Sequence, residues 1–106
     1  MNVTLELTDT IALITLDDGK KNAITLDAIR DINTALDEAE ADAAAIVLAG
    51  RPGAFCAGFD LATMTGGDME AIRALGLGGG RIAHRLYGMD KPLLAACTGH
   101  AFTIGA

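Results

Sequence analysis

Hydrophobic and polar residues alternate at the start of the chain. Apolar residues occupy every second position from 3 to 7, so residues 2–8 are expected to form a strand with one solvent-facing side. A turn at Asp9–Thr10 leads into a more apolar strand over residues 11–16. Strands joined by so short a turn indicate an antiparallel hairpin.

The pattern then changes to helical spacing over roughly residues 25–41. Apolar residues recur every three or four positions, and charged residues cover the other faces. Thr25 offers a hydroxyl to cap the first turn, and the helix dipole favours the negative charge of Asp27 there. We therefore expect an amphipathic helix with Leu26, Ile29, Ile32, Leu36 and Ala39 on its apolar face.

Two short continuous apolar runs, residues 44–49 and 93–97, predict strands that are buried on both faces. Between them, a helix over residues 68–75 is expected to be interrupted by the glycine-rich residues 76–80, and a second helix is expected over residues 81–89. A hairpin, helices and buried strands together predict an α/β fold in which helices cover a sheet.

Composition narrows the class of protein. The 106 residues fit one small domain or a piece of a larger one, and 51% hydrophobic content excludes a disordered chain. A net charge of −6 disfavours nucleic acid and anionic membranes as partners. Neither a signal peptide nor a membrane span is expected. Two cysteines make no disulfide framework, so a cytoplasmic location is expected.

The most informative segment for chemistry is residues 53–61. Ala57 and Gly58 are small enough for the backbone to approach a ligand closely, and a turn after a strand leaves N–H groups unpaired. Such N–H groups, aimed at one point, stabilise negative charge that develops on a carbonyl oxygen. An ordinary glycine turn accounts for the same spacing equally well.

A second segment, residues 91–106, has a related arrangement. A strand leads into a glycine-containing turn and the start of a helix, where N–H groups are unpaired and the helix dipole adds positive charge. Alone this is a weak signal. Two such strand ends in one small domain favour acyl chemistry, in which two donors act on one oxygen.

Three segments, in order, resemble motifs of the enoyl-CoA hydratase/isomerase (crotonase) family. They are Lys21-Asn22-Ala23, residues 54–61 and residues 91–101, so the resemblance covers nearly the whole chain. It implies a crotonase-like (ClpP/crotonase) fold built from strand–strand–helix units. Residues 1–106 would be the N-terminal part of an acyl-CoA-binding domain whose C-terminal remainder is absent. Because apolar faces would then lack cover, residues 1–106 are not expected to fold autonomously.

The resemblance also assigns roles to individual residues. The backbone N–H groups of Phe59 and Ile104 are implied to form the oxyanion hole. The family usually has a run of glycines near the second position, so the side chain of Ile104 would narrow the acyl pocket. Lys21 is a candidate for a CoA phosphate, although a solvated turn lysine is an equally good account of it. The remaining substrate-binding candidates are Ala23, Ala57, Gly58, Asp60 and Leu61.

Other reactive side chains are expected to be structural. Asp60 is expected to brace its loop instead of acting as an acid. Cys56 and Cys97 are flanked by small apolar residues and are expected in the core. His84 is expected to be structural or on the surface, whereas His100 follows the second motif and is a weaker candidate for a proton shuttle. No metal-ligand spacing appears in the sequence.

The function implied by the resemblance is that of an acyl-CoA-processing enzyme that stabilises a thioester enolate, most commonly by hydrating a 2-enoyl-CoA. The CoA thioester is the substrate, no other cofactor is implied, and the full-length protein would be a homotrimer or hexamer. Isomerase, thioester hydrolase, decarboxylase and dehalogenase reactions use the same hole. The family's two catalytic glutamates lie beyond residue 106. A non-catalytic acyl-CoA-binding fragment or remnant is the alternative.

Overall fold

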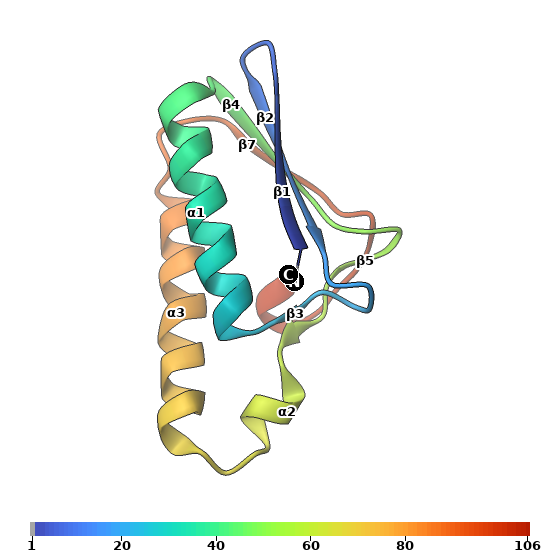
Figure 1. Ribbon diagram of the computed structural model, residues 1–106, viewed down its shortest axis with the longest axis vertical. Coiled ribbons are helices and arrows are strands. Elements are labelled where there is room, and N and C mark those ends of the chain that lie inside the picture. The colour runs from blue at the N-terminus through green and yellow to red at the C-terminus, as the bar shows by residue number, and fades with distance from the viewer. Residues whose placement is uncertain (1) are drawn as a thin grey trace.

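The structure, a computed structural model, describes residues 2–106 and contains a four-stranded sheet with two long helices on one side (Figure 1). Its strands are β1 (Asn2–Thr8), β2 (Ile11–Asp17), β4 (Ala45–Ala49) and β7 (Leu93–Ala96), in that order across the sheet. β1 pairs antiparallel with β2, whereas β2 with β4 and β4 with β7 are parallel. The expected hairpin and α/β class are confirmed.

The helix α1 (Leu26–Asp42) connects β2 to β4 and confirms the amphipathic pattern. The hydroxyl of Thr25 accepts a hydrogen bond from the N–H of Ala28 at 3.0 Å, so the expected cap is present. Parallel neighbours need such a crossover connection, because the chain must return to the same end of the sheet. The buried face of α1 consists of Ala28, Ile29, Ile32, Ala35, Leu36 and Ala39.

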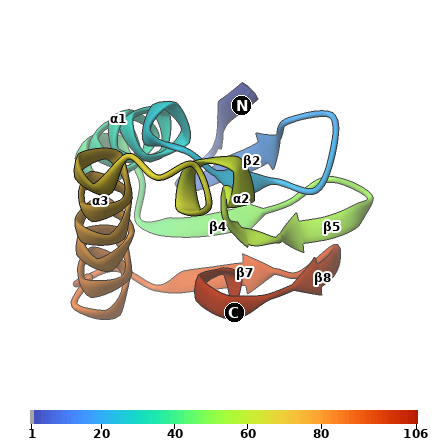
Figure 2. The ribbon, with the colours of Figure 1, turned by 90° about the horizontal axis from the view of Figure 1, so that it is seen from below.

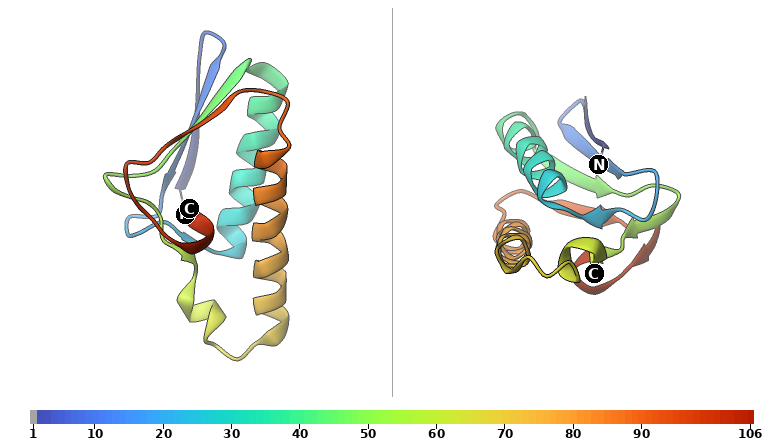
Figure 3. Two further views of the ribbon diagram at one scale, coloured as in Figure 1. Left: turned by 180° about the vertical axis from the view of Figure 1, so that it is seen from behind. Right: turned by 60° about the horizontal axis from the view of Figure 1, so that its bottom comes forward.

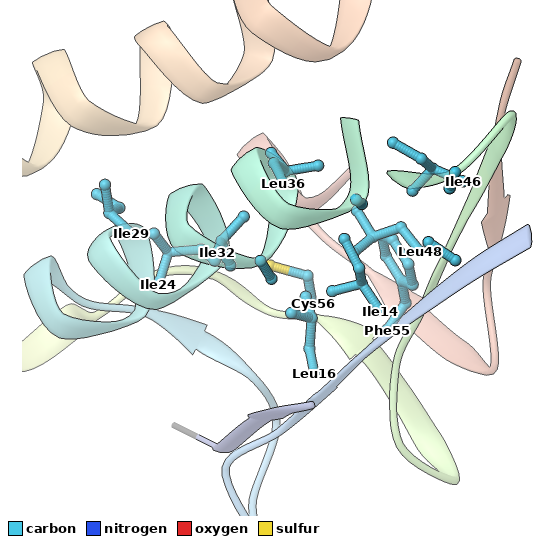
Figure 4. Packing of buried hydrophobic residues seen from close by; sticks show 14 of the residues in the cluster. Ile14, Leu16, Ile24, Ile29, Ile32, Leu36, Ile46, Leu48, Phe55 and Cys56 are labelled. Carbon is cyan, nitrogen blue, oxygen red and sulfur yellow. The ribbon is translucent and has the colours of Figure 1, made fainter. Parts of the chain in front are cut away.

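The hydrophobic core lies between this face of α1 and the sheet (Figure 4). Ile14 of β2 and Ile46 of β4 point into it with no more than 1% of their surface exposed. Phe55 and Cys56 are buried among these residues, which confirms that Cys56 is a core residue. Cys97 was expected in the core as well, and that prediction is wrong: its side chain is exposed.

The exposure of Cys97 has the same cause as a second wrong expectation. The run over residues 93–97 was predicted to be buried on both faces, yet Leu94 is 64% exposed. β7 is an edge strand of the sheet within residues 2–106. Both long helices cover one face of this sheet (Figure 3), and Leu94 lies on the opposite face. The run over residues 44–49 was also predicted to be buried on both faces, and that prediction is wrong: in β4 buried positions alternate with half-buried ones, because the long helices cover one face of the sheet.

Two small parallel sheets extend one end of the main sheet (Figure 2). One pairs β3 (Ala23–Ile24) with β6 (Gly58–Phe59), and the other pairs β5 (Gly53–Cys56) with β8 (Gly99–Ala101). The short helix α2 (Leu61–Met64) and the 3-10 helix η1 (Thr103–Gly105) follow β6 and β8. Three segments that are far apart in the sequence therefore meet in one region.

The glycine-rich residues 76–80 do not interrupt a helix, so the expectation of two helices is wrong. A single helix, α3 (Met69–Tyr87), runs through them beside α1 (Figure 3). Close packing explains why glycine is present: a Cβ on Gly78 would lie 2.9 Å from Cδ1 of Ile29, and one on Gly79 would lie 2.5 Å from Cε1 of Phe59. Tertiary contacts at these positions outweigh the poor helix propensity of glycine.

We predict that alanine has opposite effects at two glycines of α3. Gly79→Ala is expected to lower the free energy of unfolding by about 1 kcal/mol, because overpacking against Phe59 exceeds the gain in helix propensity. At Gly76 an added Cβ meets no atom within 4 Å. Gly76→Ala is therefore expected to raise the free energy of unfolding by up to about 1 kcal/mol. Urea unfolding of the full-length protein measures both, and equal changes of the same sign would contradict the packing account.

Candidate functional site

The turn between β2 and β3 is held by the side chain of Asn22, which is fully buried and has a left-handed backbone with φ of 59°. Its Nδ2 donates to the carbonyl oxygens of Leu16 at 2.8 Å and Phe55 at 3.0 Å. Its Oδ1 accepts from the N–H of Asp18 at 2.9 Å. One amide thus joins the end of β2, the turn and β5.

The carboxylate of Asp18 organises the same turn from the other side. It accepts hydrogen bonds from the N–H groups of Lys20 at 2.7 Å, Asn22 at 2.9 Å and Ala23 at 3.1 Å. Burial alone would raise the pKa of Asp18, but these three donors and the positive charge of Arg51 outweigh it, so the pKa lies below its ordinary value. An ionised Asp18 therefore fixes the backbone that carries both turn lysines.

Beside this turn lies an open hollow of about 760 Å³. Its lining consists of Asp18, Lys20, Lys21, Ala23, Thr25, Ala57, Phe59, Asp60 and Leu61. All the candidate site residues are among these except Gly58 and Ile104. The lining contains two lysines, two aspartates and the apolar Phe59 and Leu61, so the hollow can contact both an anionic part and an apolar part of a ligand.

Gly58 lies where β6 touches the segment that leads into η1. Its φ of +94° is in the region that favours glycine, and a Cβ there would overlap the hydroxyl of Thr103. On either side, the N–H of Ala57 donates to the carbonyl of Asn22 at 3.2 Å and that of Asp60 donates to Ile24 at 2.9 Å. The two donors are three residues apart, whereas the two acceptors, in β3 and just before it, are two residues apart, so one extra residue lies between the bonds, as in a β-bulge.

Phe59 and Ile104 are neighbours as a result, although 45 positions separate them in the sequence. A Cβ on Gly79 would meet the ring of Phe59 and, at 3.1 Å, Cδ1 of Ile104, so both side chains contact the same point of α3. The N–H of Ile104 is in the first turn of η1 and donates to no acceptor within residues 2–106. It remains available for a ligand.

The carboxylate of Asp60 caps α2. Its Oδ2 accepts from the N–H of Thr63 at 3.1 Å and from the hydroxyl of the same residue at 2.7 Å. This contact braces the loop after β6, as expected from the place of Asp60 in the motif. Asp60 also lines the hollow.

The two histidines occupy different places. His84 is exposed on α3, far along the sequence from the hollow-lining segments. His100 is exposed on β8 and stacks on Phe102 with ring centroids 5.3 Å apart. It borders a separate hollow of about 100 Å³ that also touches Lys21 and Ala57, so it lies near the main hollow without lining it.

Residues 2–106 contain no cluster of three histidine, cysteine or acidic side chains that would hold a metal ion. Across the same residues, no helix combines the length and the apolar character needed to cross a membrane.

Comparisons with known proteins identify the family to which the chain belongs. The family model for enoyl-CoA hydratase/isomerase matches residues 6–106. A short-chain-enoyl-CoA hydratase from Clostridium acetobutylicum is 32% identical over 106 residues, a match that covers 94% of this chain and 40% of that protein. The crystal structure of an enoyl-CoA hydratase/isomerase family protein from Pseudomonas syringae is 41% identical, with a TM-score of 0.92 over 97% of this chain and 44% of that one.

A further crystal structure, of an enoyl-CoA hydratase from Mycobacterium ulcerans, is 38% identical and superposes with a TM-score of 0.94 over 97% of this chain and 46% of that one. The chain therefore belongs to the enoyl-CoA hydratase/isomerase family and has the crotonase fold, as the resemblance implied. It spans less than half the length of each of these relatives.

Sequence reasoning missed the structural roles of Asn22, Asp18 and Gly79. Asn22 was noted as part of a motif, but its hydrogen bonds to β5 join it to residues more than thirty positions away. A usable signal was present for Asp18, since an aspartate at the end of a strand commonly accepts N–H groups of the following turn.

We predict that Asn22→Ala lowers the free energy of unfolding by about 3 kcal/mol, because it leaves two buried carbonyls and one N–H without a partner. Asn22→Gly should cost about 1 kcal/mol less, since glycine adopts the left-handed backbone without strain. The matched control is Asn2→Ala, at an exposed position of β1, which should change stability by less than about 0.5 kcal/mol. Urea unfolding of the full-length protein that shows Asn22→Ala and Asn2→Ala to be equally stable would refute this role.

Proposed function

We propose that this chain supplies the CoA-binding surface and both backbone donors of an oxyanion hole in an enzyme that acts on acyl-CoA thioesters. The observation that carries the proposal is the contact of Gly58 with Thr103, because it brings Ile104 beside Phe59, which lines the hollow. Membership of the family supports the same assignment. Residues 1–106 would then be the N-terminal part of an acyl-CoA-binding domain.

The chemistry follows from two N–H groups that share one oxygen. A thioester carbonyl oxygen placed between the N–H groups of Phe59 and Ile104 gains negative charge when an enolate forms, and fixed donors stabilise that charge. In the hydration of a 2-enoyl-CoA, which we favour, water adds to the β-carbon and a proton adds to the α-carbon. The groups that move these protons come from chain outside residues 1–106, as the family's two glutamates do. No cofactor besides the CoA thioester is needed.

The CoA part would lie along the turn that Asp18 and Asn22 hold. Lys20 and Lys21 are the cations that line the hollow, and the carboxylates of Asp18 and Asp60 in the same lining are engaged by backbone N–H groups, so the two lysines would pair with a phosphate. The backbone near Ala23 and Ala57 borders the same space and would receive the adenine. A homotrimer or hexamer of the full-length protein belongs to the same proposal.

We predict that removing one oxyanion donor lowers kcat by roughly 100-fold to 1,000-fold. Replacing residue 59 or 104 by its α-hydroxy acid changes the amide to an ester, which deletes the N–H and keeps the side chain. Turnover of a 2-enoyl-CoA by the full-length protein should fall, and the infrared stretch of a bound, isotope-labelled thioester carbonyl should shift toward that of the free thioester.

The control for this experiment is the same amide-to-ester change at Leu26, the first residue of α1. The N–H of this residue has no acceptor within the helix, so its loss breaks no helical hydrogen bond. It should change neither readout. An unchanged carbonyl stretch in both donor variants would contradict the oxyanion hole. If the carbonyl stretch shifts when the thioester binds to the unmodified protein but no turnover occurs, the non-catalytic acyl-CoA-binding alternative would be indicated instead.

We also predict that Lys21→Ala raises the Kd for CoA about tenfold, because it removes one charge-assisted contact to phosphate. The affinity for a pantetheine thioester, which carries no phosphate, should not change. Arg73→Ala removes an equal charge from an exposed position of α3 and should leave both affinities unaltered. Calorimetry at two salt concentrations measures these values. Equal losses for CoA and pantetheine would show that Lys21 supports the fold and not the phosphate.

A further inference from the structure

We propose that the side chains of Phe59 and Ile104 form a wall that restricts the enzyme to short acyl groups. The inference rests on the proposed function, because it takes the thioester carbonyl to lie at the N–H groups of the same two residues. It concerns their side chains, which the oxyanion hole itself does not use.

Two spaces of different character meet at this wall. On one side is the hollow of about 760 Å³, which contains both turn lysines and is bordered by Phe59. On the other is an apolar cavity of about 300 Å³, bordered by Gly79 and Ile104. Its other walls include Leu16, Ile32, Leu48, Ile82, Leu86 and Leu93. A CoA thioester bound in the hollow would direct a long acyl chain toward this cavity.

The wall closes the passage because both side chains press against one glycine. A Cβ on Gly79 would lie 2.5 Å from Cε1 and 2.7 Å from Cζ of Phe59, and 3.1 Å from Cδ1 of Ile104. These distances leave no room for even one methyl group between the side chains and α3. Both side chains are half-buried and pack against the hydrophobic core, so they resist displacement.

The wall predicts how affinity depends on acyl length. Each methylene that enters an apolar cavity raises affinity about fourfold. With the wall closed, that gain should stop after a few carbon atoms, and further methylenes should remain in water or clash with the ring of Phe59. Substrates are therefore short 2-enoyl-CoA thioesters. An acyl chain reaches the cavity beyond the wall only when the two side chains are replaced by smaller ones.

The test compares butyryl-CoA with octanoyl-CoA by calorimetry on the full-length protein. In the unmodified protein we expect similar affinities for the two. In the double variant Phe59→Ala, Ile104→Ala we expect octanoyl-CoA to bind on the order of 100-fold more tightly than butyryl-CoA. The ratio is the readout, because damage to the oxyanion hole would weaken both ligands equally. Phe59→Leu, which keeps the loop packed, should give an intermediate ratio.

The control is Leu77→Ala, which trims an exposed side chain of α3 two residues from Gly79 and should leave the ratio unchanged. A ratio that is already large in the unmodified protein, or one that does not rise in a folded Phe59→Ala, Ile104→Ala variant, would overturn the wall and leave the proposed function intact. Failure of every thioester to bind would overturn both.

Discussion

The structure around the site depends on one buried amide, the side chain of Asn22. Among residues 2–106, Asn22 is the one polar residue that is buried in the core. Its side chain forms hydrogen bonds with main-chain atoms of β2, of the turn and of β5. Buried polar groups are costly unless fully paired, so this network has one low-energy arrangement. The turn that carries Lys20 and Lys21 therefore has a fixed position relative to β5 and β6. The carboxylates of Asp18 and Asp60, which line the hollow, hold the turn and the loop after β6 in place from within it.

A second constraint is the close approach of backbone segments at glycines. A Cβ on Gly99 would overlap Gly53, and one on Gly105 would lie 2.9 Å from the carbonyl carbon of Cys56. Together with the contact at Gly58, these contacts pack the backbone of β8 against β5 and that of η1 against Cys56 and β6. Two N–H-bearing strand ends that are separate in the sequence become adjacent only because no side chain stands between them. The amide of Asn22 fixes one of these ends, and the glycines bring the other to it.

Much of the fold was predictable from local pattern. Period-two alternation, helical spacing and the Thr25 cap identified β1, β2 and α1 because each is decided by residues close in sequence. The resemblance identified the segments that line the hollow. The failures share one physical cause, which is tertiary context. Residues 76–80 look like a helix break, yet Phe59 and Ile29 make glycine necessary inside α3. Cys97 and Leu94 lie in an apolar run, yet the run forms an edge of the sheet and they are exposed.

The central claim is that the anchored turn and the glycine contacts bring the N–H groups of Phe59 and Ile104 to one oxygen. NMR of the protein labelled with nitrogen-15 tests it most directly, by comparing a bound acyl-CoA thioester with its thioether analogue, which lacks the carbonyl. The account predicts that the amide protons of Phe59 and Ile104 both shift downfield with the thioester and that neither shifts so with the thioether. Equal responses to the two ligands, or a downfield shift at only one of the two amides, would contradict it.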